Sequence, residues 1–216
     1  MPRTTTRDRA RGPRPYERRR KLPIALTAVL LAALATVTWV MVFSTASEGT
    51  ASNECPAPTA GKVAGREVSY GSLDSVPPAG VRDVRFQVLN AGGQRGEGNL
   101  VSAQLKDLQF AEAGTPGNDP AYPDGKLECA GQLRFGPSGA AAASTLSLAL
   151  PCMELIRDER QSSAVDVVVG SGFTDVAPGR ASRDVLDQLS AGAGDNGGAK
   201  ADPGLVSQAR KNICSS

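Results

Sequence analysis

Four cysteines are the residues with the most distinctive chemistry in this chain, and all follow an uncharged apolar run that ends at residue 43. An even set of cysteines outside the cytoplasm is typical of two disulfides. A helix returns antiparallel to the strand before it, so we expect Cys129, at the start of one strand, to pair with Cys152, after the following helix. Cys55 would then pair with Cys214 and tie the chain after the apolar run to its far end. The other two connectivities of four cysteines stay open.

A glycine-rich turn is the second feature that could contact a ligand. The segment AGGQRG at positions 91–96 lies between a predicted strand and a predicted helix, and it approaches the dinucleotide fingerprint with alanine in the first place. Exposed amides at a helix N-terminus can hold an anionic group, which makes Asn90, Gly92, Gly93 and Gly96 candidate ligand-contacting residues. A tight turn explains the same glycines without a ligand, and we favour this interpretation.

No catalytic or metal-binding pattern is visible. The chain has no histidine, so Ser-His-Asp, Cys-His and His-Cys zinc arrangements are excluded, and none of its six lysines lies in a recognisable motif. Asp119 and Asp124 form a carboxylate pair in a proline-rich loop, 114–125, which we interpret as solvated loop acids because calcium loops space their ligands more tightly. We therefore expect no catalytic residue, no cofactor and no bound metal.

The N-terminal part has the pattern of a membrane anchor. Residues 1–21 carry nine basic and two acidic side chains, a net charge of +7, whereas the whole chain is +2 and the remainder is therefore −5. The uncharged run 22–43 is long enough to cross a bilayer, and the positive-inside rule places residues 1–21 in the cytoplasm. A basic head beside an apolar run favours the membrane over nucleic acid as its partner. A cleaved signal after residues 44–46 is the alternative.

Alternating hydrophobic positions predict strands at 84–88, 129–135 and 164–169, and helical spacing predicts helices at 99–109 and 137–150. With a short strand at 110–113, the order is β-α-β-β-α-β. This order predicts an α/β fold, an α+β two-layer sandwich, preceded by a single transmembrane helix.

We therefore divide the chain into a basic cytoplasmic head (1–21), a transmembrane helix (22–43), a stalk (44–62), an extracytoplasmic domain (63–176) and a C-terminal tail (177–216). The tail contains helices at 182–189 and 203–212, separated by a glycine-rich linker. Residues 63–80 are expected to be an irregular loop.

Three segments together resemble the LytR C-terminal domain family: VRFQVLNAGGQRGEGNLVSAQLKDLQF at 84–110, LRFGPSGAAAA at 133–143 and VDVVVGSGF at 165–173. The chain departs from the family where Glu97 and Gly98 follow the turn and where Gln109 replaces a glycine. A single apolar segment with four exported cysteines is similar to actinobacterial members that support envelope integrity. The resemblance implies a non-catalytic envelope protein and transfers no active-site residue.

Two functions are consistent with these features. The first is a membrane-anchored accessory or binding module of cell-wall assembly, whose partners would be the cytoplasmic membrane and a cell-wall polymer or envelope-assembly proteins. The second is a transmembrane adaptor that regulates envelope enzymes through its basic head, since such heads bind anionic lipid or cytoplasmic partners. A basic patch such as residues 1–21 does not by itself favour nucleic acid as a partner.

Overall fold

The computed structural model describes residues 21–47, 55–58, 65–192 and 200–211, which belong to two units divided at residue 50. The predicted cytoplasmic head up to residue 20, most of the predicted stalk, the glycine-rich linker and Cys214 lie outside the described residues.

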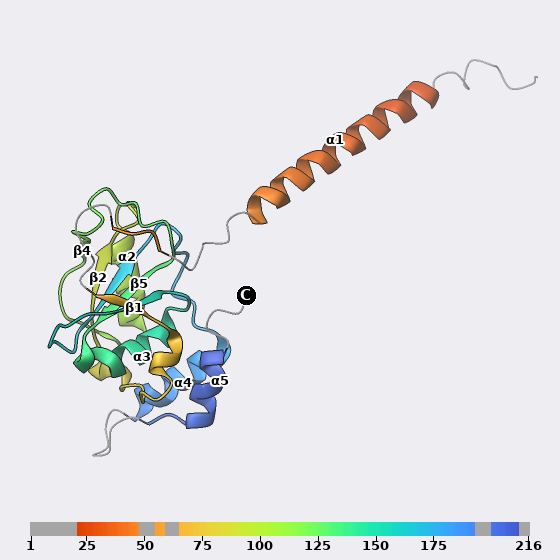
Figure 1. The fold of residues 1–216 in the computed structure, drawn as a ribbon. Coiled ribbons are helices and arrows are strands. Elements are labelled where there is room, and N and C mark those ends of the chain that lie inside the picture. Colours follow the sequence, from red (N-terminus) through yellow and green to blue (C-terminus); the bar gives the residue numbers. More distant parts are fainter. Residues whose placement is uncertain (1–20, 48–54, 59–64, 193–199, 212–216) are drawn as a thin grey trace, which may run out of the picture. The chain divides into compact units, whose positions relative to one another are not determined.

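The described part of the first unit is one helix, α1 (Lys21–Ser47), which contains the predicted apolar run (Figure 1). Its large apolar side chains are exposed, from Leu26 at 66% to Val37 at 54%. The hydroxyls of Thr36 and Thr38 donate to carbonyls one turn earlier, at 2.8–3.1 Å. Within the described part of the chain, no helix combines the length and the apolar character that crossing a membrane requires. The transmembrane assignment therefore stays a prediction.

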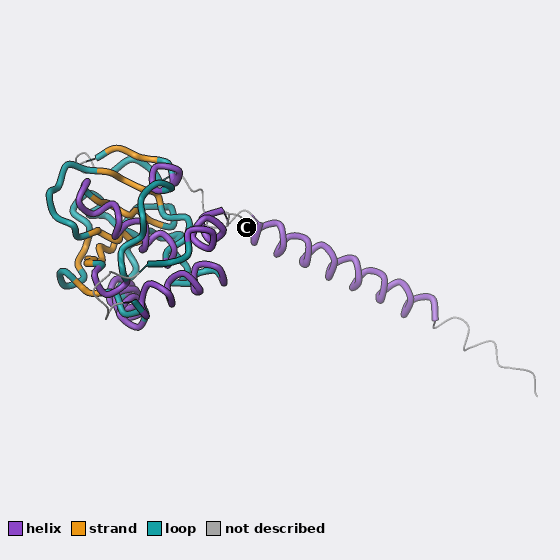
Figure 2. Tube along the Cα trace, turned by 90° about the horizontal axis from the view of Figure 1, so that it is seen from below, coloured by secondary structure: helices purple, strands orange, loops and turns teal. Residues whose placement is uncertain are grey.

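The second unit has a mixed sheet of seven strands in the order β1-β6-β5-β7-β2-β3, with β4 also paired to β2. Figure 2 shows the strands of this unit in orange and its helices in purple. The strands are β1 (Arg66–Val68), β2 (Arg85–Asn90), β3 (Ala111–Glu112), β4 (Gly117–Asn118), β5 (Gly131–Phe135), β6 (Glu154–Arg157) and β7 (Val165–Val169). The central strand β7 runs parallel to β2 and antiparallel to β5. At the edge, β1 runs antiparallel to β6.

One apolar core lies on the helix side of this sheet. The helices are α2 (Glu97–Asp107), α3 (Ala140–Ala149), α4 (Arg180–Ala191) and α5 (Pro203–Lys211), with short 3-10 turns η1 (Tyr70–Leu73), η2 (Val81–Asp83) and η3 (Pro137–Gly139). Alternate residues of β2, β5 and β7 meet the helices in the core, as strand geometry requires; they are Phe86, Val88, Leu133, Phe135, Val165, Val167 and Val169.

The opposite face of the sheet is covered by segments without helices. A smaller apolar cluster there joins Val168 of β7 to Tyr122, Leu127 and Cys129 from the long loop before β5, and Cys55 packs against it. All five residues of β5 are buried as a consequence.

The mixed α/β class is confirmed, and the predicted element order is incomplete. The three predicted strands, the short strand after α2 and all four predicted helices of this unit are present, with ends that differ by at most three residues. The sequence interpretation missed β6, and it was wrong in treating residues 63–80 as irregular, because β1 and η1 lie there. It also missed β4 in the proline-rich loop. These strands are two to four residues long, too short to show a period.

Helix α2 ends in a left-handed residue that the sequence comparison had singled out. Gln109, where the family has glycine, takes φ 70. The amides of Gln109 and Phe110 donate to the carbonyls of Lys106 and Leu105, which is the Schellman pattern of a helix C-terminus. The Gln109 side chain accepts hydrogen bonds from Arg82 at 2.8 and 3.0 Å.

Candidate functional site

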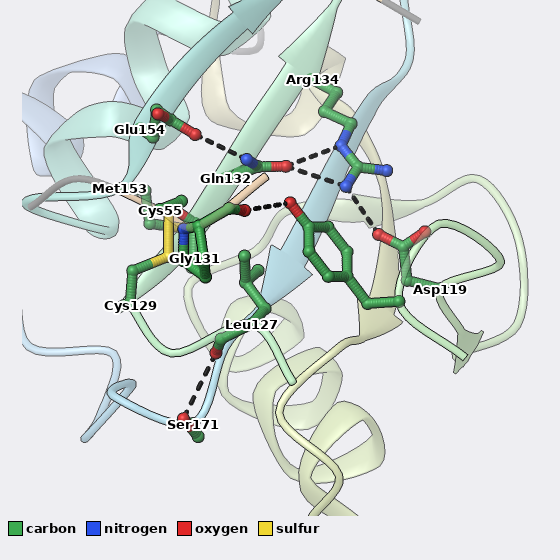
Figure 3. The surroundings of a disulfide bond; sticks show 12 residues. Cys55, Asp119, Leu127, Cys129, Gly131, Gln132, Arg134, Met153, Glu154 and Ser171 are labelled. Carbon is green, nitrogen blue, oxygen red and sulfur yellow. Dashed lines mark hydrogen bonds and ion pairs between the residues drawn. A yellow bond between two sulfur atoms is a disulfide. The ribbon is translucent and has the colours of Figure 1, made fainter. Parts of the chain in front are cut away.

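A disulfide joins Cys55 to Cys129, with an S–S distance of 2.02 Å and a Cα–Cα distance of 5.0 Å (Figure 3). The predicted pairing of Cys129 with Cys152 and of Cys55 with Cys214 is therefore wrong. The argument assumed that the strand starts at Cys129, whereas β5 starts at Gly131 and Cys129 belongs to the cluster on the face opposite the helices. Pro151, directly before Cys152, instead lines a hollow beside α4 and α5.

The disulfide fastens the described segment 55–58 onto the sheet. The hydroxyl of Tyr122, itself 1% exposed, donates to the carbonyl of Pro56 at 2.8 Å. Segment 55–58 is thus held at two neighbouring points, one by a covalent bond and one by a part-buried hydrogen bond.

A connected series of polar side chains lies beside the Cys55–Cys129 disulfide, on the same face of the sheet (Figure 3). Gln132 donates to Glu154 at 2.5 Å and accepts from Arg134 at 2.8 and 3.0 Å. Arg134 also lies 2.7 Å from Asp119, in an ion pair whose side chains are 9% and 0% exposed. We call Glu154, Gln132, Arg134 and Asp119 the polar chain.

Asp119 was interpreted as a solvated loop acid, and that interpretation is wrong. Its second carboxylate oxygen accepts the amide of Ala121 at 2.8 Å, which closes a turn in the loop. The Arg134 guanidinium lies 6.0 Å from the centre of the Tyr122 ring, within cation–π range. Arg134 is buried and holds the loop to the sheet through its ion pair with Asp119.

Burial dominates the electrostatics at the other end of the polar chain. Desolvation raises the pKa of Glu154 above its ordinary value, and the charge of Glu67 raises it further, while hydrogen bonds from Gln132 and the Cys55 amide lower it. Burial also raises the pKa of Tyr122. The arrangement is suited to holding the loop and the segment 55–58 in one position, because its hydrogen-bonding groups are directed at each other.

The candidate ligand-contacting turn is held by its own asparagine. Asn90 ends β2, and its side-chain oxygen accepts the amides of Gly92 and Gly93 at 3.1 and 3.2 Å, while its side-chain nitrogen donates to the Gln94 carbonyl at 2.5 Å. A side chain at Gly92 would place its Cβ 2.6 Å from the Ser171 amide, so this position requires glycine for close packing.

Gly96 takes φ 83 at the N-cap of α2, and Glu97 follows in the first turn with a pKa raised by burial. The turn borders a hollow of about 410 Å³ together with Asn118 and Asp124. Two of the amides that would meet an anion are thus occupied by Asn90, and a role in ligand contact stays a prediction.

Sequence reasoning missed the polar chain as a unit. Alternation along β5 does place Gln132 and Arg134 on the face away from the core, and this was the one available signal. Nothing in the sequence shows that the proline-rich loop covers that face, because this contact joins segments far apart in the chain.

Three comparisons with known proteins agree with this architecture. The family model described as LytR cell envelope-related transcriptional attenuator matches residues 83–173, so the resemblance to the LytR C-terminal domain is confirmed. The crystal structure of the soluble domain of a conserved hypothetical secreted protein from Mycobacterium marinum is similar, with a TM-score of 0.63 and 38% identity; the match covers 69% of this chain and 98% of that chain. The chain is also 34% identical over 206 residues to the cell envelope integrity protein Cei of Mycobacterium tuberculosis, with 93% of each chain covered. The chain therefore belongs to the family of the cell envelope integrity protein Cei.

Proposed function

We propose that this chain is a membrane-anchored, non-catalytic extracytoplasmic module that supports cell envelope integrity by binding a partner of wall assembly. The observation that carries the proposal is the Cys55–Cys129 disulfide, which fixes the segment after the proposed anchor to the sheet. A disulfide requires an oxidising compartment, which agrees with an exported domain. The names of two relatives, a cell envelope integrity protein and a secreted protein, agree with the same role.

The anchor in this proposal is the uncharged run 22–43, with residues 1–21 in the cytoplasm. Support comes from the positive charge before the run, from the exposed leucines of α1 and from the threonine hydroxyls that α1 satisfies internally. Hydroxyls that donate hydrogen bonds to carbonyls of their own helix suit a helix in lipid, where no water is available to accept from them.

Membrane extraction tests the anchor. We expect the full chain to stay in the pellet at alkaline pH and to keep its full mass, whereas Leu30→Arg with Leu34→Arg releases it, because each central arginine costs roughly 3 kcal/mol in a membrane helix. The matched change Leu100→Arg, on an exposed position of α2, should stay in the pellet. Recovery of a shortened, soluble wild-type chain would contradict the anchor.

Complementation tests the function. In a mycobacterial strain lacking its own Cei, we expect this chain to restore resistance to envelope stress, and Cys55→Ser with Cys129→Ser to restore it less. Hydrolysis or transfer of wall precursors by the purified full chain at enzyme-like rates would refute the non-catalytic role.

The adaptor alternative is tested in the same strain by replacing the basic residues 18–21 with neutral ones. Loss of complementation with correct topology and an intact exported domain would favour the adaptor.

A further inference from the structure

Two arginines face each other across the edge of the sheet. β1 and β6 are antiparallel, and their register places Arg66 directly opposite Arg157. Side chains at such positions point to the same face with Cβ atoms roughly 5 Å apart, and like charges there are destabilising. Gly65 fixes this register, because a Cβ at that position would come within 2.8 Å of the Arg157 carbonyl oxygen.

The charges of this pair are unmatched within the described residues, where neither guanidinium has an ion-pair or hydrogen-bond partner. The neighbouring carboxylates do not serve them. Asp158 is bound by Arg160 at 2.6 Å, and Arg160 also bridges to Asp166 at 2.7 Å. The repulsion between the two guanidiniums is not offset by an ion pair within the described residues. Because proteins break such local rules mainly at functional sites, we infer that the two arginines bind a group from outside the chain.

Arg66 and Arg157 line the same hollow, of about 930 Å³, together with Asp158, Glu159 and Gln161. Asp158 is paired with Arg160, so the hollow combines two unmatched guanidiniums with one exposed carboxylate, that of Glu159, and one exposed amide. A carboxylate ligand is commonly satisfied by a single guanidinium in a bidentate pair, whereas a phosphate has enough oxygens to accept from two. Glu159 and Gln161 are suited to accept from hydroxyl groups beside that phosphate.

We propose that Arg66 and Arg157 form a binding site for the phosphate group of a phosphorylated sugar or polyol, with Glu159 and Gln161 beside its hydroxyls. This inference rests on the proposed function, since it names the ligand class of the binding module. The same phosphate chemistry occurs in wall polymers and in lipid headgroups, so the test includes both sources.

Binding of the full chain in detergent is measured with a fluorescent poly(glycerol phosphate), with neutral dextran, and by calorimetry with glycerophosphoglycerol, the soluble headgroup of phosphatidylglycerol. We expect the phosphate polymer to bind, dextran not to bind, and Arg66→Gln with Arg157→Gln to weaken polymer binding about tenfold, because two charge-assisted contacts are lost. The matched control is Arg180→Gln with Arg183→Gln, which removes the same charge from exposed positions of α4 and should change binding less than about twofold. Binding of glycerophosphoglycerol but not of the polymer, lost only in the Arg66 and Arg157 variant, would assign the phosphate to a lipid headgroup.

Equal weakening in both double variants, or no binding of the wild type to the polymer and to glycerophosphoglycerol, would overturn the site. The thermal midpoint is a second measurement: relief of the like-charge pair should keep or raise it, and a lower midpoint would show that the arginines are structural. If the Arg66 and Arg157 variant loses polymer binding but still complements fully, the role of this site in the proposed function is overturned and that function stands. A wild-type chain that binds but fails to complement would refute the function alone.

Discussion

Removing the Asp119 carboxylate should be among the most damaging single changes in the unit that contains the sheet. Asp119 is fully buried and lies 2.7 Å from Arg134, whose side chain is only 9% exposed. In Asp119→Ala, Arg134 keeps only the oxygen of Gln132 as a buried acceptor. Breaking a buried ion pair by removing one partner costs about 3–5 kcal/mol, and the Ala121 amide also loses its acceptor. We therefore expect the free energy of unfolding to fall by about 4 kcal/mol.

Urea unfolding of the oxidised chain, followed by far-UV circular dichroism, measures this loss. Asp124→Ala is the matched control, because Asp124 is an exposed acid of the same loop, and it should change stability by less than about 0.5 kcal/mol. The double change Asp119→Leu with Arg134→Met removes both charges and should be less damaging than Asp119→Ala, since no buried charge is left without its partner.

A loss below about 1 kcal/mol for Asp119→Ala would refute this reasoning, because it would place the pair in the range of solvent-exposed salt bridges. A double change as damaging as the single one would refute it differently, by showing that packing rather than charge is responsible.

Three further predictions follow from the same unit. Cys55→Ser with Cys129→Ser should lower the free energy of unfolding by about 4 kcal/mol in chemical denaturation, because the bond closes a loop with a sequence separation of 74; an unchanged midpoint would contradict this. Burial raises the pKa of Glu154, so the stabilising contribution of its carboxyl group is complete below pH 4.5 and is lost as the pH rises through the folded-state pKa. The free energy of unfolding of the wild type, compared with that of Glu154→Gln, should therefore fall over that pH range. A difference between the two that does not depend on pH would refute this prediction. Gln109→Gly relieves a left-handed residue and should raise the thermal midpoint, by up to roughly 1 kcal/mol in stability, despite the lost exposed contact with Arg82; a lower midpoint would show that this contact dominates.

The elements predicted correctly from the sequence are those long enough for the spacing of their apolar residues to be visible. Val84, Phe86 and Val88 alternate over five residues, and a strand is found there. By contrast, β1 and β4 have three and two residues, and each exists because a neighbouring strand supplies its hydrogen bonds. A pattern within a segment cannot report such a partner.

The polar chain and the disulfide were beyond sequence reasoning for a related physical reason. An aspartate in a proline-rich loop is usually solvated, and Asp119 departs from this rule only because the loop folds over Arg134. The cysteine pairing was argued from strand and helix order alone, which does not determine on which face of the sheet Cys129 lies. Both the solvated Asp119 and the Cys129–Cys152 pairing were predicted wrongly for the same reason: the sequence does not show that the loop before β5 packs on the sheet face opposite the helices.

The corrected pairing makes a prediction about the remaining cysteines. If the four cysteines form two disulfides, as the proposed export implies, Cys152 pairs with Cys214, which lies outside the described residues. The chain length permits it: α5 ends at Lys211, which lines one hollow with Tyr70, and Tyr70 donates to the Met153 carbonyl at 2.6 Å. Three further residues extend up to roughly 10 Å. Peptide mapping without reduction should yield a Cys152–Cys214 peptide, and alkylation of either thiol in the native, oxidised chain would refute the pairing.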